Sequence, residues 1–134
     1  MPRRSRRAPP PDAPLVRRAF EAVLERVEAA KAALVAAVPT ARVEGRPLAE
    51  SLLGFEGELR AALAGMDAWR RVDHEGLWRA CRDGVEDALR RAERARLEAP
   101  TLDFEGLVDL IGEMMAPLDP FAEADRRLGR TGRP

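Results

Sequence analysis

Apolar residues recur at steps of three and four along four separate segments of this chain, and this spacing constrains the possible folds more than any other feature. Such a period places the residues on one face of an α-helix, whereas a half-buried β-strand alternates apolar and polar residues. No segment shows the strand pattern. The sequence therefore predicts an all-α protein whose helices each bury one face. The four stripes are Val16, Phe20, Val23, Val27, Ala30, Leu34 and Val38; Leu48, Leu52, Phe55, Leu59, Leu63, Met66 and Trp69; Leu77, Cys81, Val85, Ala88, Leu89 and Ala92; and Phe104, Leu107, Val108, Ile111, Met114 and Met115.

Prolines and polar capping residues mark where these helices begin and end. Aspartate or threonine accepts hydrogen bonds from the free N–H groups of a first turn, and proline is tolerated there but not in the helix interior. Asp119 before Pro120 repeats the pattern of Asp12 before Pro14, which predicts a short fifth helix. The predicted helices run from Asp12 to Pro39, from Pro47 to about Arg70, from Asp73 to Pro100, from Thr101 or Asp103 to a stop or kink at Pro117, and from Phe121 to Leu128.

Helices joined by short turns most simply form an up-down bundle. We therefore expect one domain over residues 12–128, a four-helix up-down bundle with a short C-terminal fifth helix and disordered basic ends. Residues 1–11 form the Arg/Pro-rich arm and residues 129–134 a flexible tail. Gly54 and Gly57 interrupt the second helix at about 1 kcal/mol each relative to alanine, so we expect another helix to approach closely there.

The net charge of zero hides an uneven distribution of charge. All 23 acids but only 15 of the 23 bases lie between residues 12 and 125, so this body carries −8 and each end carries +4. Mobile arginines can neutralise phosphates and release counterions, which makes the first arm a candidate for nucleic-acid contact. No recognition motif or aromatic ladder accompanies it. Alternatively, the arms maintain solubility or contact acidic helices of the same or another chain. The candidate phosphate contacts are Arg3, Arg4, Arg6 and Arg7.

Cysteine usage and hydropathy predict a soluble protein of the cytoplasm. The chain has one cysteine, so it has no internal disulfide framework, which fits a reducing compartment. No export signal is readable, and no uncharged apolar run reaches the roughly 18 residues that a membrane span needs. We expect no membrane partner.

No constellation of reactive residues predicts catalysis, a metal or a cofactor. Cys81 and Ser51 are the best-placed nucleophiles, and neither has a readable base and orienting group beside it. His74 is the only histidine, so a di-iron site with two Glu-x-x-His motifs is excluded. We therefore predict no catalytic, cofactor-binding or metal-ligating residues. The carboxylate pairs Glu56 with Glu58 and Asp83 with Asp87 are interpreted as ordinary helix surface.

Residues 101–125 contain seven acids and no base, and they follow an arginine-rich helix. One interpretation is that these two helices pack with complementary charges and bury their apolar residues in the core. The other is that the apolar residues beside the acids form an adaptable groove for a partner, as methionine-rich surfaces do. Two tryptophans near the turn between the second and third helices are further candidates, because tryptophan is enriched at binding hot spots. The candidate partner surface is Met114, Met115, Leu118, Phe121, Trp69 and Trp78.

Three functional hypotheses follow from the sequence. The first is a non-catalytic helical-bundle module for protein–protein interaction or self-association, because the chain is rich in apolar stripes and poor in convergent reactive groups. The second is a nucleic-acid-associated protein that uses its arginine-rich ends. The third is a small-molecule-binding or enzymatic bundle, which would need a pocket around Cys81, His74 and facing carboxylates.

Overall fold

The computed structural model describes residues 13–36, 46–72, 76–98 and 103–129. Every element in this part of the chain is helical, which confirms the predicted all-α class. The four long helices are α2 (Ala13–Val35), α3 (Arg46–Ala64), α4 (Leu77–Glu98) and α5 (Phe104–Met115). Shorter elements are the 3₁₀ helices η2 (Met66–Val72) and η4 (Ala116–Leu118), the helix α6 (Pro120–Ala124) and the π-helix η5 (Asp125–Gly129).

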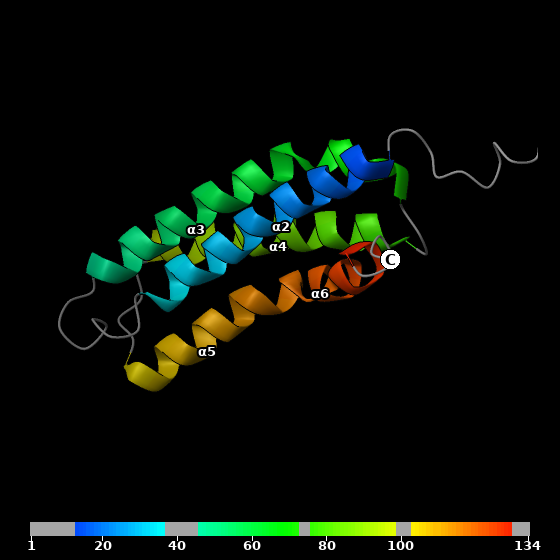
Figure 1. Cartoon of the computed structure of the whole chain (residues 1–134). Helices are drawn as coiled ribbons and strands as arrows, with labels where there is room; N and C mark the ends of the chain where they lie inside the picture. The colour runs from blue at the N-terminus through cyan, green and yellow to red at the C-terminus, as the bar shows by residue number, and fades with distance from the viewer. Residues whose placement is uncertain (1–12, 37–45, 73–75, 99–102, 130–134) are drawn as a thin grey trace, which may run out of the picture.

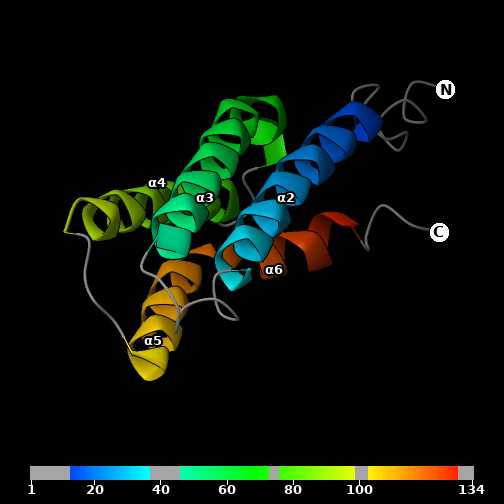
Figure 2. The same ribbon diagram turned by 90° about the vertical axis from the view of Figure 1, so that its left-hand side faces the viewer.

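Consecutive long helices run in alternating directions (Figure 1). Helix α3 packs against both α2 and α4, while η4 and α6 pack against α4 and η5 returns to α2. These contacts are compatible with the expected up-down order. Figure 2 looks at the end of the molecule where α4 finishes and α5 begins, and it shows the last turns of α4 and the first turns of α5 standing apart.

The buried face of α2 is the one that the sequence predicts. Six of its seven predicted stripe residues are buried, and the seventh, Val38, lies outside the described residues. Their steps of three and four keep them within one face over the 23 residues of the helix. The length of α2 and the face that it buries therefore both follow from the spacing of its apolar residues. The six buried residues are Val16, Phe20, Val23, Val27, Ala30 and Leu34.

The second helix is shorter than predicted. It ends at Ala64, and the chain passes through Gly65 into the 3₁₀ helix η2 rather than continuing to Arg70. A Cβ atom on Gly65 would lie 2.9 Å from Cγ2 of Val23, so α2 approaches the backbone closely at this position. Trp69 has a non-helical backbone (φ −120°, ψ 17°), and its ring meets Phe20 edge-on with centroids 4.9 Å apart. The break thus places Trp69 against α2 in the core.

The expected close approach at Gly54 and Gly57 is wrong. Nothing lies within 4 Å of a Cβ built on Gly57, and Gly54 would make only an ordinary 3.5 Å contact with Ala33. Besides the approach at Gly65, the backbone is approached closely on α4, where a Cβ on Gly84 would lie 1.9 Å from the backbone oxygen of Pro117. Gly84 is therefore the residue that lets η4 pack directly on α4.

The C-terminal helices confirm one predicted cap and correct another. Asp103 caps α5, because its Oδ1 accepts a hydrogen bond from the Gly106 N–H at 2.7 Å. Asp119 makes no such bond: its backbone is already helical (φ −55°, ψ −35°), whereas a capping side chain needs an extended residue. Instead of one helix over Phe121–Leu128, the chain forms α6 and then η5. The predicted alternative cap Thr101 and the predicted cap Asp73 lie outside the described residues.

Candidate interaction surface

The predicted partner surface is a set of core residues. Met115 is half-buried, and the other five side chains are at most 4% exposed, so they form no groove for a partner. Phe121 stacks on Phe20 with centroids 6.5 Å apart, and the indole N–H of Trp78 donates to the Met66 carbonyl oxygen at 2.8 Å. Core packing, the alternative interpretation of these residues, is what the structure has. The five buried residues are Met114, Leu118, Phe121, Trp69 and Trp78.

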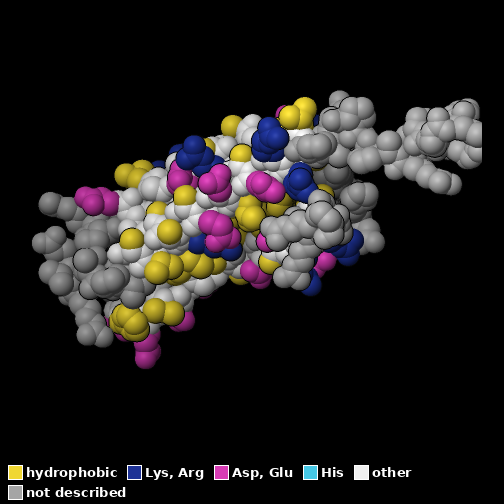
Figure 3. All heavy atoms as spheres, viewed as in Figure 1, with side chains coloured by type: hydrophobic (Ala, Val, Ile, Leu, Met, Phe, Trp, Pro, Cys, Tyr) yellow, Lys and Arg dark blue, Asp and Glu magenta, His cyan; other side chains and the backbone are white. Residues whose placement is uncertain are grey.

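Other large apolar side chains are exposed, and most of them gather at one end of the molecule. This is the end where α2 and α4 finish and α3 and α5 begin. Figure 3 shows apolar side chains over α5 and along its border with α2. Of the large apolar residues that the structure describes as exposed, only Leu15 lies at the opposite end, in the first turn of α2. The exposed residues at the first end are Val35, Leu53, Leu97, Phe104 and Val108.

The sequence predicts that Phe104 and Val108 belong to the buried stripe of their helix, but both are exposed. The core line of α5 is Leu107, Ile111 and Met114, whereas Val108 is 44% exposed. Consecutive residues of a helix are separated by about 100°, so Val108 faces a direction different from that of Leu107. The sequence contains an indication of this exposure, because the segment that forms α5 has more apolar residues than one helix face accommodates.

The acids of α5 are not neutralised by the neighbouring arginine-rich helix. Glu105, Asp109 and Glu113 are exposed, and none makes an ion pair with any residue in the described ranges. The expected charge complementarity between the third and fourth helices is therefore not found in this part of the chain. Helix α5 therefore combines exposed apolar residues with acids that no described residue neutralises.

The arginines of α4 pair with other residues instead. Arg82 lies 3.7 Å from Glu86, and both Arg90 and Arg91 contact Asp87, all within α4. Arg94 is exposed and has no ion pair among the residues that the structure describes. Close to it, Leu97 is 70% exposed. The last turns of α4 thus carry an available positive charge beside an apolar side chain.

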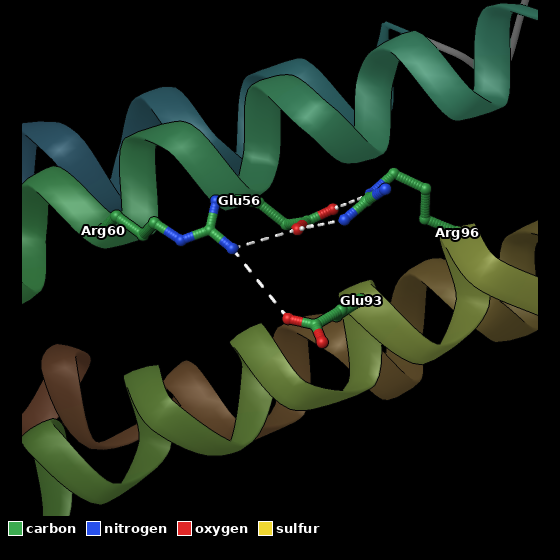
Figure 4. Close-up of polar contacts among 4 residues, drawn as sticks. All are labelled: Glu56, Arg60, Glu93 and Arg96. Atoms are coloured by element: carbon green, nitrogen blue, oxygen red, sulfur yellow. Dashed lines mark hydrogen bonds and ion pairs between the residues drawn. The ribbon is translucent and has the colours of Figure 1, made fainter.

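A buried carboxylate fixes α4 to α3 (Figure 4). Glu56 is fully buried, and its two oxygens accept from Nε and Nη2 of Arg96 at 2.7 and 3.2 Å. Arg60 donates to the same carboxylate at 3.4 Å and lies 3.9 Å from Glu93. The hydrogen bond to Glu56 raises the pKa of Arg96 above its ordinary value. Both positive side chains stay partly in water while the negative charge lies inside.

The interpretation of Glu56 and Glu58 as a pair on one solvated surface is therefore wrong. Glu58 reaches the other neighbour of α3, where its Oε1 accepts from Nη1 of Arg26 on α2 at 3.1 Å. Glu56 is directed to α4. Because the two are two residues apart, about 200° of helix separates them, and they contact different helices.

The candidate nucleophile Cys81 lies in the core. It is fully buried, and desolvation raises the pKa of its thiol to about 12, so the thiol is protonated at neutral pH. His74 lies outside the described residues, and Ser51 is half-buried on α3. Within the described ranges no group of three or more histidine, cysteine or acidic side chains is arranged to hold a metal ion.

The first arm, with Arg3, Arg4, Arg6 and Arg7, also lies outside the described residues. At the other end of the chain, Arg126 and Arg127 both bind Glu123, and the hydrogen bond from Arg127 lowers the pKa of that carboxyl.

No helix in the described part of the chain is both long and apolar enough to cross a membrane. No family model matches the sequence, and neither a curated protein nor a solved structure matches the chain.

Proposed function

We propose that this chain is a non-catalytic helical module that binds proteins through the end where α4 finishes and α5 begins. We call this region the α4–α5 surface and define it by Arg90, Arg94 and Leu97 on α4 and by Glu105, Val108 and Asp109 on α5. The observation that carries the proposal is the exposure of Leu97 beside Arg94 on α4 and of Val108 beside acids on α5 that no described residue neutralises.

Because these apolar side chains are in contact with water, a partner that buries them gains binding free energy. Burial of apolar surface contributes roughly 25 cal/mol per Å². Apolar residues rimmed by charged ones are typical of interaction sites, where the core of the contact excludes water and the rim sets specificity. The single thiol of the chain remains consistent with a cytoplasmic location, which we propose as the compartment of this interaction.

Two exposed leucines at opposite ends of the molecule provide a matched test. Leu97→Asp and Val108→Asp should abolish recovery of a bound protein, whereas Leu15→Asp should not, although Leu15 is 61% exposed and equally apolar. The measurement is co-purification of tagged protein from its host with each variant, followed by reconstitution with the purified partner. A second tagged copy of the chain is included as a candidate partner. Equal recovery with all three variants and wild type would refute the proposal.

The arginine-rich ends support a second proposal, contact with nucleic acid that does not depend on sequence. Figure 1 shows the first turn of α2 and the last described element, η5, at the same end of the molecule. The described residues to which the two basic segments are connected therefore lie at the same end, so both segments can approach one polyanion. Removal of residues 1–11, with its four arginines, should lower the slope of log affinity against log salt by roughly 3 to 4. Unchanged binding of a DNA duplex after this truncation would contradict the arm-based version.

A further inference from the structure

The two halves of the α4–α5 surface carry opposite charge at the same helical spacing. On α4, Arg90, Arg94 and Leu97 lie at i, i+4 and i+7, which places them on one face, and all three are exposed. On α5, Glu105 and Asp109 lie at i and i+4 with Val108 beside them, and these are exposed as well. Each half thus presents two like charges one turn apart next to an apolar side chain.

The α4 half faces away from the helix that holds α4 in place. Arg96 binds Glu56 on α3, and Arg94 lies two residues earlier, about 200° around the helix. Arg90 has only an exposed contact of 3.7 Å with Asp87 in its own helix. No described ion pair joins α4 to α5, and Figure 2 shows the relevant turns of the two helices standing apart. Within one molecule, the two halves do not neutralise each other.

We propose that the occupant of this surface is a second copy of this chain, bound across a two-fold axis. A two-fold interface must be self-complementary. If a residue of the first copy contacts a given residue of the second, then the same two positions also make contact with the copies exchanged. The α4 half of one copy then contacts the α5 half of the other, twice. Arg90 and Arg94 pair with Glu105 and Asp109, while Leu97 and Val108 are buried between them. This inference rests on the proposed function and specifies its partner.

Charge complementarity favours a second copy over an unrelated protein. Each half carries two charges, and the one-turn spacing between them is the same in both halves. One copy therefore supplies the complement that the other lacks. Both halves also belong to one end of the molecule, because only the short segment from 99 to 102 separates α4 from α5. A single two-fold operation can therefore satisfy both at once.

The test is charge reversal followed by complementation, with sedimentation equilibrium of the full chain from about 1 µM to about 1 mM. The wild-type chain should be a dimer within this range. The variants are Glu105→Arg/Asp109→Arg and Arg90→Glu/Arg94→Glu. Each should raise the dissociation constant of the dimer at least about tenfold above that of wild type, because each creates two repulsive contacts. An equimolar mixture should recover the dimer, since its mixed dimer has one native and one reversed attractive contact.

Each other result overturns the proposal in a recognisable way. A wild-type chain that stays monomeric throughout, or a dimer unaffected by both reversals, excludes this interface. Loss of the dimer only in Glu105→Arg/Asp109→Arg would mean that the basic arms, and not α4, bind the acids of α5. Two weakened variants whose mixture stays dissociated would exclude the pairing of α4 with α5. Circular dichroism of each variant checks the fold, which four exposed positions should leave intact. A monomer that still binds another protein through Val108 would refute the dimer but preserve the proposed function.

Discussion

Glu56 and Arg96, 40 residues apart in the sequence, form a two-point contact in which the carboxylate is fully buried and the guanidinium remains partly in water. A planar guanidinium matches a carboxylate in this geometry, which fixes direction as well as distance. The contact therefore defines how α4 is rotated relative to α3, and so which face of α4 is exposed at Arg94.

Replacement of Arg96 by alanine should destabilise the fold much more than replacement of Arg26. Loss of Arg96 leaves the buried carboxylate of Glu56 with only the 3.4 Å contact to Arg60, and removal of one partner of a buried ion pair typically costs about 3 to 5 kcal/mol. Arg26 and Glu58 form an exposed pair, for which about 0 to 1 kcal/mol is typical. Urea unfolding of Arg96→Ala and of the control Arg26→Ala measures the difference.

The double variant Arg96→Ala/Glu56→Leu should recover part of the stability that Arg96→Ala loses. Leucine removes the buried charge and fills an apolar environment between α3 and α4, and an apolar replacement of a whole buried pair is often neutral or stabilising. The double variant and Arg96→Ala are compared by their urea midpoints. If the double variant is the less stable of the two, the damage in Arg96→Ala comes from lost packing and not from the uncompensated charge.

Gly84 and Gly57 should respond in opposite directions to alanine. A Cβ on Gly84 would lie 1.9 Å from the Pro117 oxygen, which is a backbone atom and can move only if η4 separates from α4. Overpacking of this kind typically costs about 1 to 3 kcal/mol. Gly57 is on the helix surface with no atom within 4 Å, so Gly57→Ala should stabilise the protein by up to about 1 kcal/mol through helix propensity. Thermal unfolding of both variants tests this, and a stabilising Gly84→Ala would show that η4 does not pack on α4 as described.

The two tryptophans should differ in what their indole N–H groups contribute. Trp78 donates to the Met66 carbonyl oxygen at 2.8 Å, whereas Nε1 of Trp69 is buried and finds no acceptor among the described residues. Both Trp→Phe changes remove a similar volume, but only Trp78→Phe deprives a carbonyl of its donor, which typically costs about 1 to 3 kcal/mol. Denaturant unfolding should therefore show Trp78→Phe to be less stable than Trp69→Phe. The reverse order would indicate that the N–H of Trp69 has a partner in solution.

The sequence predicts those parts of the structure that depend on local periodicity. The stripe from Val16 to Leu34 and the cap at Asp103 are confirmed, because each depends on neighbours within a few residues. Glu56 could not be assigned to the interior, since the residue that makes its burial tolerable lies on another helix. The exposure of Val108 likewise depends on how far α5 stands from its neighbours. For the candidate surface, the sequence alone shows the run of acids. Only the packed structure shows which side chains of that run face water.

The thiol of Cys81 should make the stability of the protein depend on alkaline pH. Desolvation raises the pKa of this thiol from 9.0 to about 12, so folding favours its protonated form. This contribution is present in full below pH 9, where the thiol is protonated in both states, and is lost as the pH rises toward 12. Few other groups titrate in this window, because the chain has no tyrosine and Lys31 is its only lysine. Urea unfolding between pH 8 and pH 11 should show a decline in wild type and a shallower one in Cys81→Ala. Equal slopes, together with rapid reaction of the native thiol with a disulfide reagent at pH 8, would mean that Cys81 is accessible to solvent and that α4 is not packed as the core requires.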